Sequence, residues 1–107
     1  MSSLSPRSSA VSATGYVYVL QFSKPLGNAN HCASYYIGWA KCFEARLAYH
    51  RAGRGAAITR AAVEQGIELT PIILIRGDKT LERRLKNWKS AKKVIRRYLS
   101  SSENLIK

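Results

Sequence analysis

The run Ile72-Ile73-Leu74-Ile75 constrains the fold most, because it is apolar on both sides of any strand that contains it. Successive side chains of a strand point to opposite faces, so such a strand must be covered on both faces. We predict a strand over Glu68 to Arg76, with Pro71 near its start or on a sheet edge because proline has no N–H to donate. The segment Tyr16 to Phe22 is aromatic and β-branched, and it predicts a second strand with both faces largely covered.

Other segments complete a small α+β chain. Ser34 to Gly38 predicts a third strand, which forms a hairpin with Tyr16–Phe22 across a loop from Lys24 to Asn30. Apolar residues recur at helical spacing in three segments, which are Phe43–Ala52, Ala57–Gln65 and Thr80 to about Leu99, the last with a possible break near Ser90. In the first of these helices, Phe43 and Leu47 share a stripe with either His50 or Arg51.

The predicted order is β-β-α-α-β-α(-α), which is an α+β fold with a small sheet flanked by helices. The length of 107 residues allows one domain, which we assign to residues 15–99. Residues 1–14 contain six serines and a single charge, so we predict a disordered tail there, and residues 100–107 form a short C-terminal tail.

The charge balance points to an anionic partner. Eighteen Lys and Arg face six Asp and Glu, which gives a formal net charge of +12. Neutralising phosphates with such a surplus drives nucleic-acid binding, although a ribosomal or chromatin-type protein that binds without reacting has the same property. Nine of the basic residues lie on the last predicted helix or directly before it, and these are Lys79, Arg83, Arg84, Lys86, Lys89, Lys92, Lys93, Arg96 and Arg97.

The remaining composition indicates an intracellular setting. Cys32 and Cys42 are interpreted as free thiols, and the N-terminus lacks the apolar core of a secretory signal. The longest strongly apolar run is too short to span a bilayer. We therefore predict a cytoplasmic protein, present as a monomer or weak dimer.

Glu82 is the only acid between Lys79 and Arg97. One interpretation is an ordinary i,i+4 ion pair with Lys86, which contributes only a few tenths of a kcal/mol. The other is a metal ligand, because Mg²⁺ requires oxygen ligands and accepts one or two protein carboxylates together with water and phosphate. The spacing alone leaves both interpretations open.

A second group of polar residues lies on the early elements. Arg46 and His50 are four residues apart, so they project from one face of their helix and form either a phosphate clamp or a surface pair. Tyr18 and Tyr36 lie on the two hairpin strands and can meet across one face, either as core aromatics or with their hydroxyls at its rim.

Together these residues resemble the GIY-YIG nuclease superfamily, and especially its small single-domain, excision-nuclease-like members. These members are bacterial and phage proteins, so the resemblance implies a bacterial or phage-like intracellular protein. The first motif corresponds to Tyr16-Val17-Tyr18, preceded by Gly15, and the second is Tyr36-Ile37-Gly38. The helix motif is Arg46-Leu47-Ala48-Tyr49-His50 followed by Gly53-Arg54-Gly55, and the acid motif is Leu81 to Lys86. The resemblance extends over residues 15–97 and implies a three-stranded antiparallel sheet with surrounding helices.

The chain departs from the family pattern at three points. Tyr16 stands where the first motif has glycine, and the loop from Ser23 to Ser34 is longer than in the compact members. The asparagine that many members carry near the end has no clear counterpart, since Asn87 and Asn104 are poor candidates. Small members often lack this asparagine, so we read its absence as a subfamily character.

The resemblance implies a metal-dependent DNA endonuclease, structure-selective in repair or recombination, with RNA not excluded as a substrate. Its catalytic residues would be Tyr18, Tyr36, Arg46, His50 and Glu82. Glu82 would hold Mg²⁺ or Mn²⁺, and Arg46 would stabilise charge on the phosphoryl oxygens. Tyr36 would help to deprotonate water with help from nearby cations and the metal, because a free tyrosine has a pKa of about 10. His50 would orient water or shuttle a proton. The nucleic-acid contacts would be Arg54, Lys86, Lys89, Lys92 and Lys93.

The alternative is a nucleic-acid-binding module that keeps the fold but does not cut. A lone acid within a basic face serves a metal site and has no use in a simple binder. Glu82 is therefore the residue that discriminates between the two interpretations.

Overall fold

A computed structural model describes residues 14–27, 32–88 and 91–106. The elements are β1 (Gly15–Gly27), β2 (Cys32–Ala40), α2 (Phe43–Arg51), α3 (Ala57–Glu64), β3 (Leu69–Gly77), α4 (Lys79–Asn87) and α5 (Ala91–Tyr98). Their order confirms the predicted α+β fold, including the break that divides the last helix. The predictions for residues 1–13, for the loop residues 28–30, for Lys89 and for the side chain of Cys32 lie outside the described residues.

The sheet has the strand order β2-β1-β3, with β1 antiparallel to both neighbours. Tyr18 of β1 pairs with Gly38 of β2 on one side and with Leu74 of β3 on the other. Pro71 lies in an edge strand, where the register of the β1–β3 pair shifts, as expected for a residue without an N–H.

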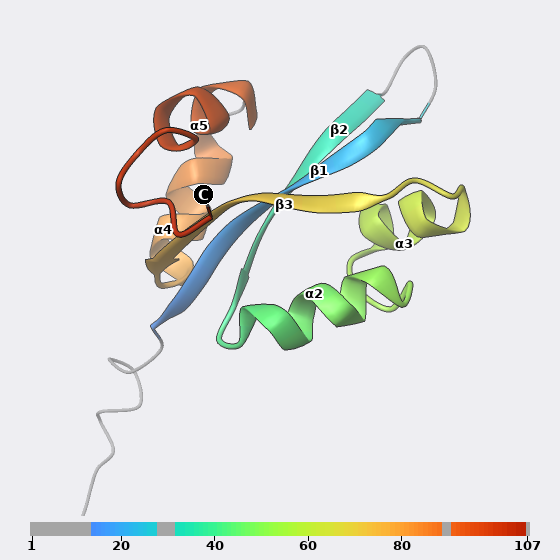
Figure 1. The fold of residues 1–107 in the computed structure, drawn as a ribbon, viewed down its shortest axis with the longest axis horizontal. Coiled ribbons are helices and arrows are strands. Elements are labelled where there is room, and N and C mark those ends of the chain that lie inside the picture. The colour runs from blue at the N-terminus through green and yellow to red at the C-terminus, as the bar shows by residue number, and fades with distance from the viewer. Residues whose placement is uncertain (1–13, 28–31, 89–90, 107) are drawn as a thin grey trace, which may run out of the picture.

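Helices cover both faces of the sheet, as the apolar strands require (Figure 1). One face, the Tyr18 face, buries Tyr18 and Leu20 against α2 and α3. The opposite face, the Val17 face, buries Val17, Val19 and Ile73 against α4 and α5. Full burial of each such apolar side chain stabilises the fold by about 1.5–3 kcal/mol. None of the helices in the described residues is long and apolar enough to cross a membrane.

The hairpin is longer than predicted. Lys24 to Gly27 were predicted to lie in the loop, but β1 continues through these residues, so that prediction is wrong. Leu26 pairs with Ala33 after a shift in register and is only 8% exposed. Burial of this leucine in the core of the Tyr18 face explains why a segment with loop-like composition remains in the sheet.

The segment after α5 is fastened to the outer edge of β3. The side chain of Asn104 is buried, accepts a hydrogen bond from the N–H of Leu74 at 2.9 Å and donates one to the carbonyl of Ile72 at 3.1 Å. The N–H of Leu105 donates to the carbonyl of Leu74 at 2.8 Å. These bonds satisfy backbone groups that an edge strand otherwise exposes, so Asn104 has a structural role at the sheet edge.

Candidate active site

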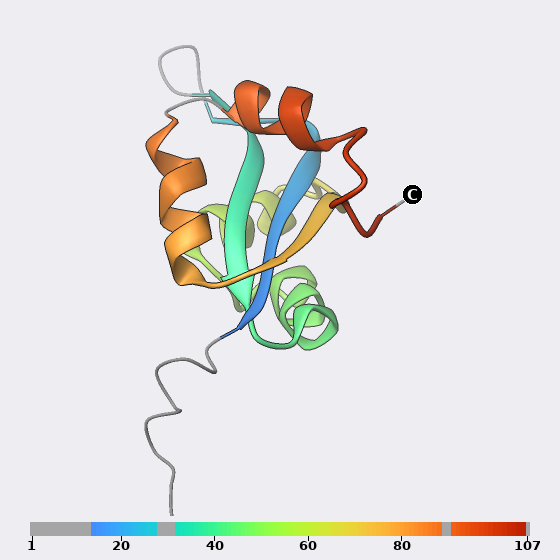
Figure 2. The same cartoon turned by 90° about the vertical axis from the view of Figure 1, so that its left-hand side faces the viewer.

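The strand directions bring the two site helices to the same end of the sheet. Because β2 and β3 are both antiparallel to β1, they run parallel to one another and finish at the same end. Helix α2 follows β2 and helix α4 follows β3 after short connections, so both helices start there. In Figure 2, α4 (orange) stands beside the edge strand β2 (teal). Arg46 and His50 on α2 can therefore approach Glu82 on α4 around the edge of β2.

A chain of buried hydrogen bonds lies beneath the Tyr18 face. The hydroxyl of Tyr18 is 2.7 Å from Nε2 of His50, and Nδ1 of His50 is 2.8 Å from the hydroxyl of Thr59. The Thr59 hydroxyl donates its only proton to the carbonyl of Ala56 at 2.9 Å, so it must accept from His50 Nδ1–H. Nε2 is then unprotonated and accepts the proton of Tyr18. The chain of bonds runs in one direction, from Tyr18 through His50 and Thr59 to the backbone.

Tyr36 lies against this chain at the half-buried surface. Its ring centroid is 5.2 Å from that of His50 and 6.2 Å from that of Tyr18. Gly38 makes the arrangement possible, because a Cβ there would lie 2.6 Å from the Tyr18 hydroxyl and 2.7 Å from the Tyr36 ring. Gly55 has the same function on the other side, where a Cβ would overlap the His50 ring. Two glycines thus provide the space for the aromatic cluster.

Charged groups surround the cluster. Lys86 lies 5.8 Å from the ring centroid of Tyr36, and its Nζ is 3.2 Å from a carboxylate oxygen of Glu82. The charges of Arg46 and Glu82 both act on Tyr18 and Tyr36 strongly enough to shift the pKa of each phenol. The structure therefore brings together all five residues predicted for catalysis, together with Lys86.

Comparison with family models gives a match to the GIY-YIG catalytic domain over residues 14–96. The chain belongs to the GIY-YIG family. The domain is therefore a nuclease domain, and nucleic acid is its substrate. No match was found among curated proteins or among solved structures.

The geometry explains the motifs of this GIY-YIG domain in physical terms. Tyr36 and Gly38 are two residues apart, so both face the Tyr18 side of the sheet, while Ile37 packs on the Val17 face. Tyr36 supplies the phenol and Gly38 leaves room for the ring of Tyr18 on the neighbouring strand. Tyr16, in place of the usual glycine, pairs with Ala40 and Arg76 and takes no part in the cluster.

Burial controls the protonation of the cluster. It raises the pKa of Tyr18, with the neighbouring Tyr36 adding to the effect. It also raises the pKa of Tyr36, although Lys86 and Arg46 act in the opposite direction. Lys86 and Arg46 thus lower the pKa of Tyr36 as expected, but desolvation and the charge of Glu82 outweigh these two cations. Burial and the charge of Arg46 lower the pKa of His50, which is therefore neutral at pH 7.

His50 and Tyr18 are more deeply buried than the sequence indicated, and each residue is only 1% exposed. Thr59, which fixes the ring of His50, is fully buried and was not predicted. Its only signal in the sequence is a hydroxyl on the inner stripe of α3, three residues before the buried Ala62. Single-residue signals of this kind are too common to identify a site.

The predicted nucleic-acid contacts divide into two groups. Lys86 lies in the candidate site, whereas Lys92 and Lys93 are exposed on α5, and Arg54 is exposed after α2. Lys93 lines a pocket of about 680 Å³ at the junction of α4 and α5, together with Asn87, Trp88, Arg96 and Arg97. Trp88 also packs against the core of the Val17 face and stacks on Tyr98. The basic residues of α5 therefore form a surface separate from the tyrosine cluster.

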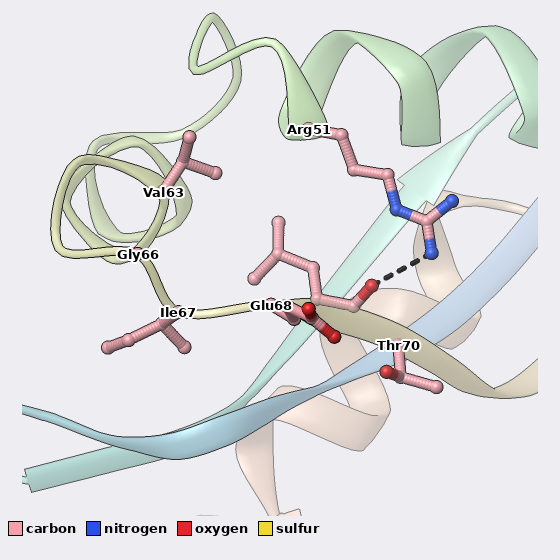
Figure 3. Close-up of a pocket in the computed structure, with 7 residues that line it drawn as sticks. Arg51, Val63, Gly66, Ile67, Glu68 and Thr70 are labelled. Atoms are coloured by element: carbon pink, nitrogen blue, oxygen red, sulfur yellow. Dashed lines mark hydrogen bonds between the residues drawn. The ribbon is translucent and has the colours of Figure 1, made fainter.

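Arg51 follows His50 directly but points away from the site. Its guanidinium donates to the carbonyl of Leu69 at 2.9 Å (Figure 3). The pocket there has a volume of about 440 Å³, and its remaining lining residues are Val63, Gly66, Ile67, Glu68 and Thr70. It shares no residue with the predicted catalytic set, so it is not part of the candidate active site.

GIY-YIG nucleases are generally metal-dependent, and the donors present fit a magnesium-like ion. The side chain of Glu82 is 21% exposed, so its carboxylate is accessible beside Tyr36. Within residues 14–27, 32–88 and 91–106, no three His, Cys, Asp or Glu side chains gather as a closed metal site would require. A hard cation held by one carboxylate, with water and substrate phosphate as its other ligands, suits this arrangement.

Proposed function

We propose that the protein is a metal-dependent endonuclease that hydrolyses phosphodiester bonds of DNA. The observation that supports this most is the convergence of Tyr36, Arg46 and Glu82 around the buried Tyr18–His50 pair. Residues from two strands and two helices have no packing reason to place two phenols, a guanidinium and a carboxylate together. We further propose that the folded domain of residues 15–99 acts as a cytoplasmic monomer or weak dimer, on structured DNA in repair or recombination.

In this proposal the chain's own groups divide the work. Glu82 would hold Mg²⁺ or Mn²⁺, which supplies charge stabilisation at the scissile phosphate. Arg46 binds the non-bridging oxygens and stabilises the charge that develops on them. Tyr36, whose raised pKa keeps it protonated, orients the attacking water by a hydrogen bond. Lys86 binds the phosphate when a substrate draws it away from Glu82.

Proton removal falls to the Tyr18–His50 pair. Tyr18 already donates to Nε2 of His50, so its oxygen can take a proton from water while its own proton moves to the ring. His50 becomes an imidazolium, held through Nδ1–H by the Thr59 hydroxyl. This step requires a neutral His50, so activity should be lost as pH falls through its lowered pKa, below the ordinary histidine value of about 6.5.

One observation favours the alternative of a non-cutting, nucleic-acid-binding module. Glu82 is paired with Lys86 at 3.2 Å, which is the ordinary i,i+4 ion pair of a helix surface. In that alternative the acid has no role beyond the helix. DNA cleavage by the pure protein distinguishes the two.

The direct test is incubation of the pure protein with labelled duplex, single-stranded and branched DNA, in Mg²⁺, Mn²⁺ or EDTA. We expect cleavage in Mg²⁺ or Mn²⁺ and none in EDTA, with branched DNA cut faster than plain duplex. Salt-sensitive binding of every DNA without cleavage under any condition would support the binding module and overturn the nuclease proposal.

Replacing Thr59 tests the direction of the buried hydrogen bonds. Thr59→Val keeps the shape but leaves Nδ1–H of His50 without its acceptor, so the ring proton can move to Nε2 and block transfer from Tyr18. We expect kcat to fall on the order of 10²-fold, with KM unchanged, as for loss of general-base assistance. The buried unsatisfied donor should also lower the free energy of unfolding by about 1–3 kcal/mol.

Thr59→Ser is the matched control because it keeps the hydroxyl, and it should restore most of kcat. Thermal unfolding of both variants shows that they are folded at the assay temperature. A folded Thr59→Val enzyme with wild-type kcat would remove the relay from the mechanism.

A further inference from the structure

A pocket beside the candidate active site has no role in the mechanism above. Its volume is about 390 Å³, and its lining residues are Ala40, Lys41, Cys42, Ala45, Arg46 and Tyr49. Residue 42 precedes residues 45 and 46 by three and four positions, and these precede residue 49 by four and three, so the four lie on one side of α2 and its start. The neighbouring stripe of the same helix carries His50 toward the tyrosines.

Arg46 belongs to both places. It lines the pocket, and its charge shifts the pKa values of Tyr18, Tyr36 and His50. A scissile phosphate bound by this guanidinium would place the nucleotide attached to it within reach of the pocket. The pockets on α3 and on α5 share no residue with the predicted catalytic set. The pocket that contains Arg46 is therefore the one placed to bind a nucleotide next to the scissile phosphate.

The lining has the chemistry of a nucleotide site. Lys41 and Arg46 supply two cations, and the six lining residues include no acid, so an anionic ligand is favoured. Ala40 and Ala45 have small side chains, which leave space in the pocket. The volume lies within the range of pockets that take small ligands, which is about 300–1,000 Å³.

Tyr49 supplies a platform for a base. It is 46% exposed, one of three large hydrophobic residues so exposed within the described residues. The guanidinium carbon of Arg46 lies over this ring, 5.7 Å from its centroid, so a cation faces one side of the aromatic ring. Aromatic rings and arginine planes are the surfaces on which unpaired bases stack in single-stranded nucleic-acid sites.

We propose that this pocket is a subsite for an unpaired nucleotide next to the scissile phosphate, with the base stacked on Tyr49 and the flanking phosphate bound by Lys41 and Arg46. The inference rests on the proposed function, because it uses the scissile phosphate at Arg46. Paired bases are already stacked within a duplex and cannot lie on the ring. The subsite therefore selects DNA that is single-stranded or frayed beside the cut.

The test measures DNA binding in EDTA, which separates it from cleavage. Single-stranded oligonucleotides that carry one fluorescent 2-aminopurine are titrated with the wild type, Tyr49→Leu and Tyr49→Phe, beside duplexes of the same sequence. Tyr49→Leu keeps an apolar side chain without the ring, and we expect it to weaken single-strand binding by about 5- to 150-fold and abolish quenching of the probe. Duplex binding should change less than about twofold, and Tyr49→Phe should behave as the wild type.

Leu99→Ala is the control for loss of an exposed apolar side chain, since Leu99 is 49% exposed on the C-terminal side of α5. Tyr49 is a surface residue, so its variants should fold, and circular dichroism is used to check this. Unchanged single-strand binding in folded Tyr49→Leu, or an equal loss for duplex and single strand, would overturn the subsite. Tyr49-dependent quenching by a protein that never cleaves would leave the subsite in place and reject only the nuclease proposal.

Discussion

Glu82→Gln is expected to lower the rate of phosphodiester cleavage by about 10³-fold or more, with DNA binding unchanged or tighter. The substitution removes the carboxylate that we propose to hold the divalent ion, and such an ion would contribute several kcal/mol of charge stabilisation at the phosphate. It also removes a negative charge that repels the phosphate and frees Lys86 to bind it. Single-turnover cleavage and fluorescence anisotropy measure the two effects separately.

Glu64→Gln is the control, because it makes the same change of charge on an exposed residue of α3. Its cleavage rate and DNA affinity should equal those of the wild type. Wild-type cleavage by Glu82→Gln in Mg²⁺ would exclude Glu82 from the mechanism. If DNA binding by Glu82→Gln weakened by the same factor as its cleavage rate, the role of Glu82 would be limited to the ion pair with Lys86.

Arg46→Ala should lower kcat by about 10²- to 10³-fold, the usual effect of removing one group that stabilises charge in the transition state. A second effect distinguishes Arg46 from a general phosphate contact. Its positive charge lowers the pKa of His50, so without it that pKa rises toward its ordinary value. His50 then becomes protonated at a higher pH. The acid limb of the pH–rate profile should therefore shift to a higher pH.

Arg46→Lys keeps the charge but loses the planar fork of donors, so it should retain the position of the acid limb while recovering only part of kcat. Arg60→Ala removes an exposed arginine from α3 and serves as the control for a general loss of charge. If Arg46→Ala changed KM alone, with kcat and the acid limb as in the wild type, its role would be limited to substrate binding.

The layered fold could be predicted because its strands carry apolar residues on both sides. The run Ile72–Ile75 requires cover on both faces, and the only segments with helical periodicity supply it. The extension of the hairpin could not be predicted. Lys24 and Pro25 favour a loop, and the pairing of Leu26 with Ala33 depends on burial of Leu26 in a core that other elements build.

The candidate site could be predicted where its residues belong to a sequence motif. It could not be predicted where a residue matters only through a contact made in the folded protein. Tyr36, Arg46 and Glu82 follow from their types and order. The spacing in α2 left either His50 or Arg51 on the inner stripe, and packing decides it, with His50 buried and Arg51 turned to Leu69. Thr59 could not be recognised, because its importance comes from a hydrogen bond between two helices.

The residues of the candidate site are held in place by two different hydrophobic cores. Tyr18, Tyr36 and His50 rest on the core of the Tyr18 face, whereas the inner residues of the helix that carries Glu82, Leu81 and Leu85, pack on the Val17 face. The sheet lies between these cores, so a change of packing in one of them moves the acid relative to the phenols without altering any polar group. Selection can therefore tune the reaction through ordinary apolar residues. An engineer can likewise redesign one core while the other keeps its share of the candidate catalytic groups in place.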